Sequence, residues 1–138
     1  MARLGRMIAM TDILKISDED IEWITGKRDF KAAARKWLKA GAKIVVVTKG
    51  GDGLEAFTAH DHIVQPAVKV KVADTVGAGD TINAGLLAAL HKARLLDKKK
   101  LAAITESQLS AALAFAAKAA AITCSRPGAD PPWAKELA

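Results

Sequence analysis

The chain has 138 residues, 51% of them hydrophobic, and a formal net charge of +6. This is enough apolar material for one domain with a buried core and too much for a disordered chain. A single cysteine, Cys124, excludes an intramolecular disulfide and a multi-cysteine metal cluster, and it favours a reducing, cytoplasmic setting. Residues 1–20 have only short apolar runs between charges, which fits neither a signal peptide nor a membrane anchor.

The positive charge raises the question of nucleic-acid binding. The lysines are scattered, and their one tight cluster, residues 98–100, falls at an expected helix junction. The sequence has no tyrosine, and its few phenylalanines and tryptophans are not interleaved with that cluster as base stacking requires. We therefore interpret the basic residues as a solvated face that also favours an anionic substrate, and a nucleic-acid-binding module is the weakest hypothesis.

The first expected elements alternate between helices and strands. Residues 2–16 contain the end of a helix and then a short buried strand. A helix is expected over residues 17–26, where Ser17 caps its start and acids fill its first turn, and a second helix over residues 29–41. Residues 42–53 place a run of aliphatic residues before a glycine turn, which is typical of a strand buried on both faces of a parallel sheet.

The second half of the chain is expected to be mainly helical. Before it come three short alternating segments that are predicted strands, residues 54–59, 62–67 and 68–73. Two long helices follow, over residues 80–96 and 106–124, and then a proline- and glycine-rich ending. The helix over 106–124 is apolar but rich in alanine and interrupted by Lys118, so we expect a buried or half-buried helix rather than a membrane span. The pattern predicts an α/β layered domain with ligands at the carboxyl ends of its strands.

The most informative segment is residues 74–80, with the sequence DTVGAGD. It is not a P-loop, because no GxxxxGK[ST] string exists, and no third glycine follows Gly77 and Gly79 to complete a dinucleotide fingerprint. The two glycines let the backbone approach a ligand closely, and the helix that begins near Asp80 adds its positive end. These features predict an anion site suited to a transferred phosphoryl group.

Asp80 has two candidate roles at this site. A carboxylate at the mouth of an anion site repels phosphate, which makes sense if it takes a proton from an attacking hydroxyl. Alternatively, Asp80 is a helix N-cap above a tight turn and contributes about 1 kcal/mol of stability. The residues of the turn leave both roles open.

The segment DTVGAGDTINAGLLAAL resembles the second signature of the ribokinase-like (PfkB-type) sugar kinases, which reads D-T-x-G-A-G-D before a helix. Three further segments resemble the same family: DILKISDEDIEWITG, VVVTKGGDG and AAAITCSRPGADPP. The SRPGADPP and SDED stretches look most like bacterial fructokinases. The resemblance implies a three-layer α/β/α fold with a mostly parallel sheet, and it covers the C-terminal half of the family pattern.

The resemblance also implies roles for the glycine turn. Asp80 would be the general base on the sugar hydroxyl. The anion hole would consist of the backbone amides of Gly77, Ala78 and Gly79. Asp74 and Thr75 fall where the family often places a monovalent cation such as K⁺, and a turn-stabilising Asx pair is the alternative interpretation.

The preceding glycine turn resembles the family's ATP site, where small residues admit the phosphates and ribose. The matching residues are Thr48, Gly50, Gly51 and Gly53. A simple β-turn is the alternative, and we expect Lys49 to face solvent. Many members carry N-x-x-E where this chain has Ser17 and Asp20, so we expect Ser17 to be a cap and Asp20 to act on Mg²⁺ through water.

Several other residues receive weaker assignments. Ala117 and Lys118 lie where nucleotide-facing residues often occur in the family. Cys124 is expected to be a small packed residue rather than a nucleophile. The three histidines, which have no metal-ligand spacing, are read as surface or strand-end residues: His60, His62 and His91.

The chain opens inside an apparent helix–strand unit, and the family's sugar-binding residues and lid strands lie upstream of anything in it. We therefore expect residues 1–138 to be the nucleotide-binding, catalytic-base portion of an ATP-dependent sugar kinase that is inactive by itself. Fructokinase is the leading assignment, and ribose, ketodeoxygluconate, a nucleoside or a sugar phosphate are alternative acceptors. A noncatalytic nucleotide-binding half-domain is a further alternative. The expected partners are a sugar, ATP, and either a second copy or the missing N-terminal half.

Overall fold

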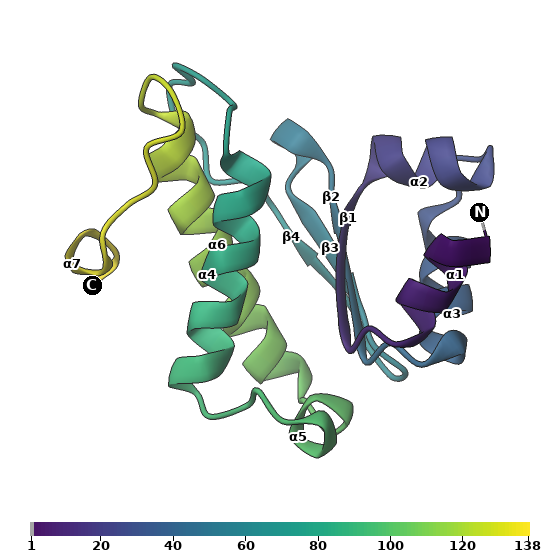
Figure 1. Cartoon of the computed structure of the whole chain (residues 1–138). Helices are drawn as coiled ribbons and strands as arrows, with labels where there is room; N and C mark the ends of the chain where they lie inside the picture. The colour runs from purple at the N-terminus through teal and green to yellow at the C-terminus, as the bar shows by residue number, and fades with distance from the viewer. Residues whose placement is uncertain (1) are drawn as a thin grey trace.

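The structure is a computed structural model that describes residues 2–138. The elements in chain order are α1 (Ala2–Ala9), β1 (Ile13–Ser17), α2 (Asp18–Thr25), α3 (Phe30–Ala40), β2 (Ile44–Thr48), η1 (Gly50–Asp52), β3 (Leu54–Phe57), β4 (His62–Gln65), α4 (Ala78–Lys92), α5 (Lys98–Ala102), α6 (Glu106–Cys124) and α7 (Ala134–Leu137). Helices α1, α2 and α3 lie on one side of the sheet, and α4 and α6 lie on the other (Figure 1). This arrangement confirms the predicted layered α/β architecture.

The four strands form one sheet in the order β1-β2-β3-β4. Strands β1 and β2 run parallel, with Ile13 opposite Ile44 and Ser17 opposite Thr48. Strands β3 and β4 are antiparallel to their neighbours, because short turns rather than crossover helices connect them. The described strands therefore contribute one parallel and two antiparallel pairings to the fold, where the sequence suggested a mostly parallel sheet.

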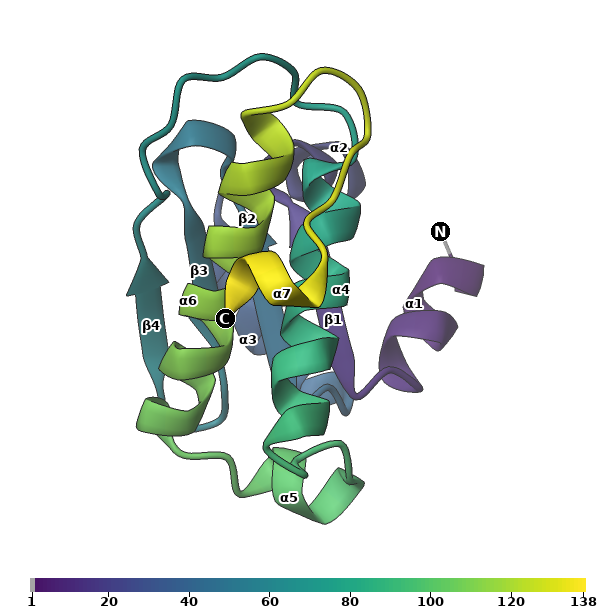
Figure 2. The ribbon, with the colours of Figure 1, turned by 90° about the vertical axis from the view of Figure 1, so that its left-hand side faces the viewer.

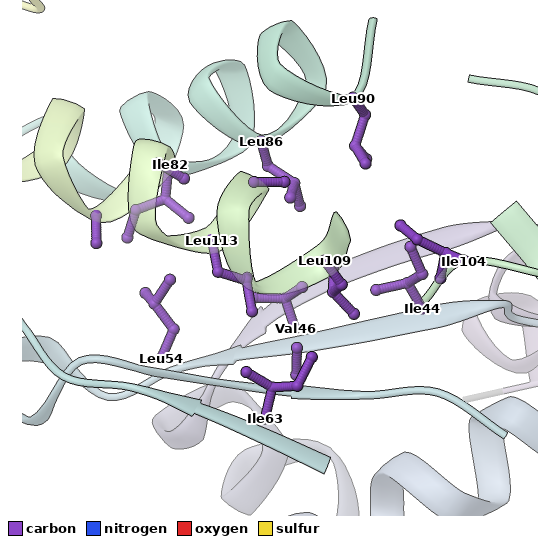
Figure 3. Packing of buried hydrophobic residues seen from close by; sticks show 14 of the residues in the cluster. Ile44, Val46, Leu54, Ile63, Ile82, Leu86, Leu90, Ile104, Leu109 and Leu113 are labelled. Carbon is purple, nitrogen blue, oxygen red and sulfur yellow. The ribbon is translucent and has the colours of Figure 1, made fainter. Parts of the chain in front are cut away.

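Strand β2 is buried on both faces, as its uninterrupted aliphatic run predicted. Its side chains alternate between two cores: Ile44 and Val46 face α4 and α6, and Val45 and Val47 face α1, α2 and α3. Figure 3 shows the first of these cores, in which aliphatic side chains from α4 and α6 pack against the sheet. The sheet is thus the middle layer, and its two faces serve different helices.

Helices α4 and α6 pack closely against each other. A Cβ added to Gly85 of α4 would lie 3.0 Å from the Cα atom of Ala116 of α6, so only glycine allows this approach. Near the start of α4, the hydroxyls of Thr81 and Thr123 lie 2.9 Å apart in the buried interface. Helix α6 has the length and composition of a membrane span, but half of its apolar window is buried, and it packs against α4 and β4 as a core helix does.

The prediction of a strand over residues 68–73 is wrong. These residues form no strand, and Val68, Val70 and Val72 are exposed. The segment follows Pro66, leaves the edge strand β4 and crosses one end of the molecule to reach α4 (Figure 2). No described strand lies beyond β4 to receive it, and its end is instead held by the Ala73 amide, which donates to the carbonyl of Cys124 at 2.8 Å.

Two short helices, α5 and α7, were not predicted. Helix α5 contains the lysine cluster at residues 98–100, and the Asp97 side chain caps it by accepting from the amides of Lys99 and Lys100. The Lys98 ammonium also pairs with Asp12 at 2.7 Å. The cluster is therefore part of a capped surface helix, which agrees with its interpretation as a solvated basic face.

Candidate functional site

A cavity of about 550 Å³ opens where the sheet, the start of α4 and the end of α6 meet. Its lining brings together both glycine turns that the sequence singled out. The turn after β2 contributes Thr48, Gly50, Gly51 and Gly53, and the second turn contributes Thr75, Ala78 and Gly79. The crossing segment and α6 add Ala67, Val68, Lys69, Val70, Val72, Ala117, Ala120, Ala121 and Cys124, and Leu54 of β3 and Ile82 of α4 complete the wall. The cavity lies at the carboxyl end of β2, where α/β folds place ligands.

The turn after β2 is a short 3₁₀ helix rather than a simple β-turn. The amide of Lys49 donates to the carbonyl of Gly53 at 2.9 Å and closes the turn. Gly53 has a φ of +93°, and a Cβ there would lie 2.2 Å from the carbonyl oxygen of Gln65. Glycine at this position is therefore required by backbone crowding. Gly51, in contrast, has nothing within 4 Å of a built Cβ, so the fold does not need a glycine there.

Lys49 was predicted to face solvent, but its ammonium instead contacts other side chains. Its ammonium pairs with Glu55 at 2.8 Å and lies 5.7 Å from the centre of the Phe30 ring, on the α3 side of the sheet. The hydrogen bond with Glu55 raises the pKa of Lys49. Glu55 also pairs with Nε2 of His62, whose ring stacks on Phe57, so His62 is a strand-end residue with a structural partner. Lys49 is thereby directed away from the cavity.

The second turn differs from the sequence expectation in where the helix starts. Helix α4 begins at Ala78, and its N-cap is Gly77, with φ +79° and no side-chain cap. Asp80 is the third helical residue, its carboxylate is exposed, and it makes no hydrogen bond within the described residues. The N-cap role for Asp80 is therefore wrong. The amides of Gly79 and Asp80 have no backbone acceptor among the described residues, whereas that of Ala78 donates to Thr75 at 3.2 Å.

Asp74 anchors this turn to the far end of the chain. Its Oδ1 atom accepts from the amide of Val76 at 3.0 Å, and its Oδ2 atom accepts from the amide of Gly128 at 3.0 Å. The hydrogen bond from Val76, and then that from Gly128, hold the pKa of Asp74 below its usual value. The Asx turn is therefore present, and both carboxylate oxygens already accept hydrogen bonds. Thr75 lines the cavity beside it.

Ser17 caps α2 as predicted: its Oγ atom accepts from the amide of Asp20 at 3.0 Å. The same hydroxyl donates to the Asp20 carboxylate at 2.7 Å. Among residues 2–138, no group of three or more histidine, cysteine or acidic side chains could hold a metal ion.

Of the two α6 residues expected near a nucleotide, only Ala117 lines the cavity. Lys118 is exposed on another face of the helix, where its ammonium donates to the carbonyl of Leu137 at 3.2 Å. The Cys124 thiol is half-buried and belongs to the cavity wall, so it is packed but also adjacent to any ligand. His60 and His91 are exposed, as expected.

One charged residue beside the site, Lys15 in β1, was not predicted from the sequence. A Cβ added to Gly79 would lie 3.3 Å from the Lys15 ammonium, so this charge stands directly beside the first turn of α4. The signal was present in the strand pattern: Ile13 packs on the α4 side of the sheet, and alternation puts Lys15 on that same side.

The model of the pfkB family of carbohydrate kinases matches residues 1–136. The chain belongs to this family. The fructokinase of Rhizobium leguminosarum bv. trifolii is 47% identical over 109 residues, which are 79% of this chain and 33% of that protein. The aminoimidazole riboside kinase of Salmonella typhimurium is 32% identical over 118 residues, 85% of this chain and 37% of that protein.

Solved structures of sugar kinases have the same fold. Aminoimidazole riboside kinase from Salmonella enterica, complexed with aminoimidazole riboside and an ATP analogue, superposes with a TM-score of 0.82 and 27% identity over 97% of this chain and 43% of that one. Fructokinase from Xylella fastidiosa with bound ATP superposes with a TM-score of 0.83 and 23% identity over 93% of this chain and 41% of that one. The chain thus has part of a ribokinase-like α/β fold, and it spans about a third of the length of the two curated relatives above.

Proposed function

We propose that the chain is the nucleotide-binding, catalytic-base portion of an ATP-dependent sugar kinase, with fructose as the favoured acceptor. One observation carries the proposal: a single cavity joins the glycine turn after β2 to the first turn of α4, and Asp80 lies in that first turn. The preference for fructose rests on the 47% identity to a fructokinase. The same family includes an aminoimidazole riboside kinase at lower identity, so a nucleoside-like acceptor is the second candidate.

The cavity suits a nucleoside triphosphate. Its volume of about 550 Å³ is within the range of small-molecule sites. Glycines at both ends keep side chains out of the way: Gly51 and Gly79 both line the cavity, and a Cβ at Gly79 would lie 3.3 Å from the Lys15 ammonium. The wall from α6 is alanine-rich and apolar, which fits the base and ribose, and the start of α4 supplies amides and a positive dipole for phosphate.

In this proposal, different residues of the chain bind the phosphoryl group and accept the proton. The free amides at the start of α4 bind the oxygens of the phosphoryl group and neutralise charge as it transfers. Asp80, exposed and unengaged within the described residues, accepts the proton of the attacking sugar hydroxyl. The Asp20 carboxylate would act through water on Mg²⁺, which would supply further charge neutralisation when bound.

A monovalent cation site at Asp74 and Thr75 remains part of the proposal in a restricted form. Both side-chain oxygens of Asp74 already accept backbone amides, so a K⁺ ion would have to share those oxygens or use backbone carbonyls of the turn.

The sugar pocket is proposed to come from an N-terminal half or a second copy. A reducing, cytoplasmic setting fits the free thiol of Cys124.

The proposal is tested first by nucleotide binding. The 138-residue chain is titrated with MgATP by calorimetry, and alkylation of the Cys124 thiol is followed with and without ATP. We expect ATP to bind and to slow alkylation, because Cys124 lines the proposed ATP cavity. No binding and no protection would contradict the proposal.

The catalytic role is tested by complementation. The chain is assayed with fructose and ATP alone and joined to the N-terminal part of the Rhizobium fructokinase, and we expect turnover only in the joined protein. Asp80→Asn should lower kcat at least about a hundredfold while ATP binding persists. Glu106→Gln, which removes an exposed acid from the first turn of α6, is the matched control. Binding of ATP without any Asp80-dependent turnover would instead favour a noncatalytic nucleotide-binding half-domain.

A further inference from the structure

Lys15 occupies an unusual place for a strand lysine. It lies in the middle of β1, opposite Val46 of β2, and its neighbour Ile13 on the same face packs into the core beneath α4. Its side chain is half-buried, and it extends along the sheet until its ammonium stands beside Gly79. A lysine on this face must either reach the carboxyl end of the sheet or lose its hydration in the core.

The charge of Lys15 has no ion-pair partner among residues 2–138. Lys15 forms no ion pair with any residue of the part that the structure describes, although six other pairs are present there. The nearby carboxylates have other hydrogen-bond partners. The Asp74 carboxylate accepts two backbone amides, and the Asp20 carboxylate accepts the Ser17 hydroxyl. Asp80 is exposed and does not reach Lys15 within ion-pair distance. A half-buried, unpaired ammonium beside free helix amides is therefore a site of concentrated positive charge.

We propose that the Lys15 ammonium is a catalytic residue that binds the terminal, transferring phosphoryl group of ATP, together with the amides at the start of α4. The inference rests on the proposed function and extends it to a residue on a different element. In the transfer, the sugar oxygen gives its proton to Asp80 and forms the new bond to the terminal phosphorus. The bond from that phosphorus to the bridging oxygen breaks, and ADP leaves with the electron pair. Lys15 keeps its proton throughout and neutralises charge on the moving group.

The position of Lys15 explains why the terminal phosphate is its target. The alanine-rich wall of α6 and the turn after β2 form the rest of the cavity, and Lys15 is not part of that lining. Its ammonium stands instead beside Gly79, which lines the cavity and directly precedes the proposed base, Asp80, in the first turn of α4. Lysine is suited to this position because it acts as a compact point charge on a flexible stem. The expected consequence is discrimination between ATP and ADP.

The test measures that discrimination on the 138-residue chain, with MgATP and MgADP as probes in calorimetric titrations. Lys15→Met keeps the length of the stem and removes the charge. We expect its affinity for ATP to fall about tenfold and its affinity for ADP to change less than about twofold, the effect of one charge-assisted hydrogen bond to the terminal phosphate. Lys15→Arg should keep most of the preference for ATP. The control is Lys36→Met, which removes an exposed charge from α3 on the opposite face of the sheet.

A second measurement needs no variant and covers the case in which Lys15→Met does not fold. Amine-reactive labelling of the wild-type chain, read by mass spectrometry, should show Lys15 protected by MgATP but not by MgADP, while Lys36 is labelled equally in both. Equal protection by the two nucleotides, or equal loss of affinity for both in Lys15→Met, would overturn the inference and leave the proposed function intact. Failure of the wild-type chain to bind ATP would overturn both.

Discussion

The carboxylate of Asp74 joins two loops that are 54 residues apart, because its Oδ2 atom accepts the amide of Gly128 at 3.0 Å. The first loop leads into α4, and the second follows α6 (Figure 2). The same carboxylate closes its own turn through the amide of Val76. Asp74 therefore fixes the entry to α4 against the end of α6, and with it the backbone amides that face the cavity.

This tether should depend on pH. Hydrogen bonds from Val76 and Gly128 lower the pKa of Asp74, so its contribution to stability is present above the unfolded pKa of about 3.9 and is lost as the pH falls through the lower folded value. We expect Asp74→Ala to unfold at a lower temperature than wild type at pH 7, and this difference to shrink as the pH approaches the folded pKa. Thermal unfolding followed by circular dichroism across that range measures it.

Hydrogen exchange supplies a direct readout of the same contact. The Gly128 amide should exchange faster in Asp74→Ala than in wild type at neutral pH. Glu19→Ala, which removes an exposed acid from α2, is the control and should leave that amide unchanged. A difference in unfolding temperature that is constant from neutral to acid pH would contradict the role of the carboxylate.

Much of this architecture could be read from the sequence because local chemistry and packing agree. The aliphatic run of β2 is buried on both faces, and Ser17 caps α2, as predicted. The predicted strand over 68–73 failed because alternation describes a strand only where a neighbouring strand is available. Beyond Pro66 the chain has left the sheet edge, so its valines are exposed.

The site was predictable only in part, because side-chain contacts between distant elements leave little trace in one sequence. The two glycine turns could be recognised in the sequence because glycine tolerates unusual backbone geometry, as at Gly77 with φ +79°. The start of α4 was placed too late, since a glycine N-cap has no side chain that marks it. Lys15 was missed because its importance arises from its approach to Gly79, a residue 64 positions further along the chain.

Gly79 should show opposite effects on stability and on nucleotide binding. It is the second residue of α4, its φ is not positive, and the closest atom to an added Cβ is the flexible end of Lys15 at 3.3 Å. Alanine is the better helix former, so Gly79→Ala should raise the free energy of unfolding by about 0.5 kcal/mol. Its methyl group would crowd the Lys15 ammonium and project from a residue that lines the cavity, so ATP affinity should fall about tenfold.

The control for Gly79→Ala lies in the same helix. A Cβ at Gly85 would lie 3.0 Å from the Cα atom of Ala116, a backbone atom that cannot move aside easily. Gly85→Ala should therefore destabilise the chain, by about 1–3 kcal/mol in chemical denaturation. If Gly79→Ala and Gly85→Ala changed stability in the same direction, the proposed geometry at the start of α4 would be wrong.

The turn after β2 offers a last contrast between a glycine required by the fold and a glycine required only by the ligand. Gly53 has φ +93°, and a Cβ there would lie 2.2 Å from the carbonyl oxygen of Gln65. Gly53→Ala should destabilise the chain by about 3 kcal/mol or more, through backbone strain and overpacking together. Gly51 has no atom within 4 Å of a built Cβ and lines the cavity, so Gly51→Ala should change stability by less than about 0.5 kcal/mol.

The two variants separate folding from binding when each is measured by both urea denaturation and ATP titration. Gly51→Ala should fold normally and bind ATP more weakly, because its methyl group projects into space that the proposed phosphates need. Gly53→Ala should lose ATP binding only to the extent that it is unfolded. Unchanged ATP affinity in Gly51→Ala would mean that the nucleotide does not approach this turn, and the cavity would then have to hold its ligand closer to α6.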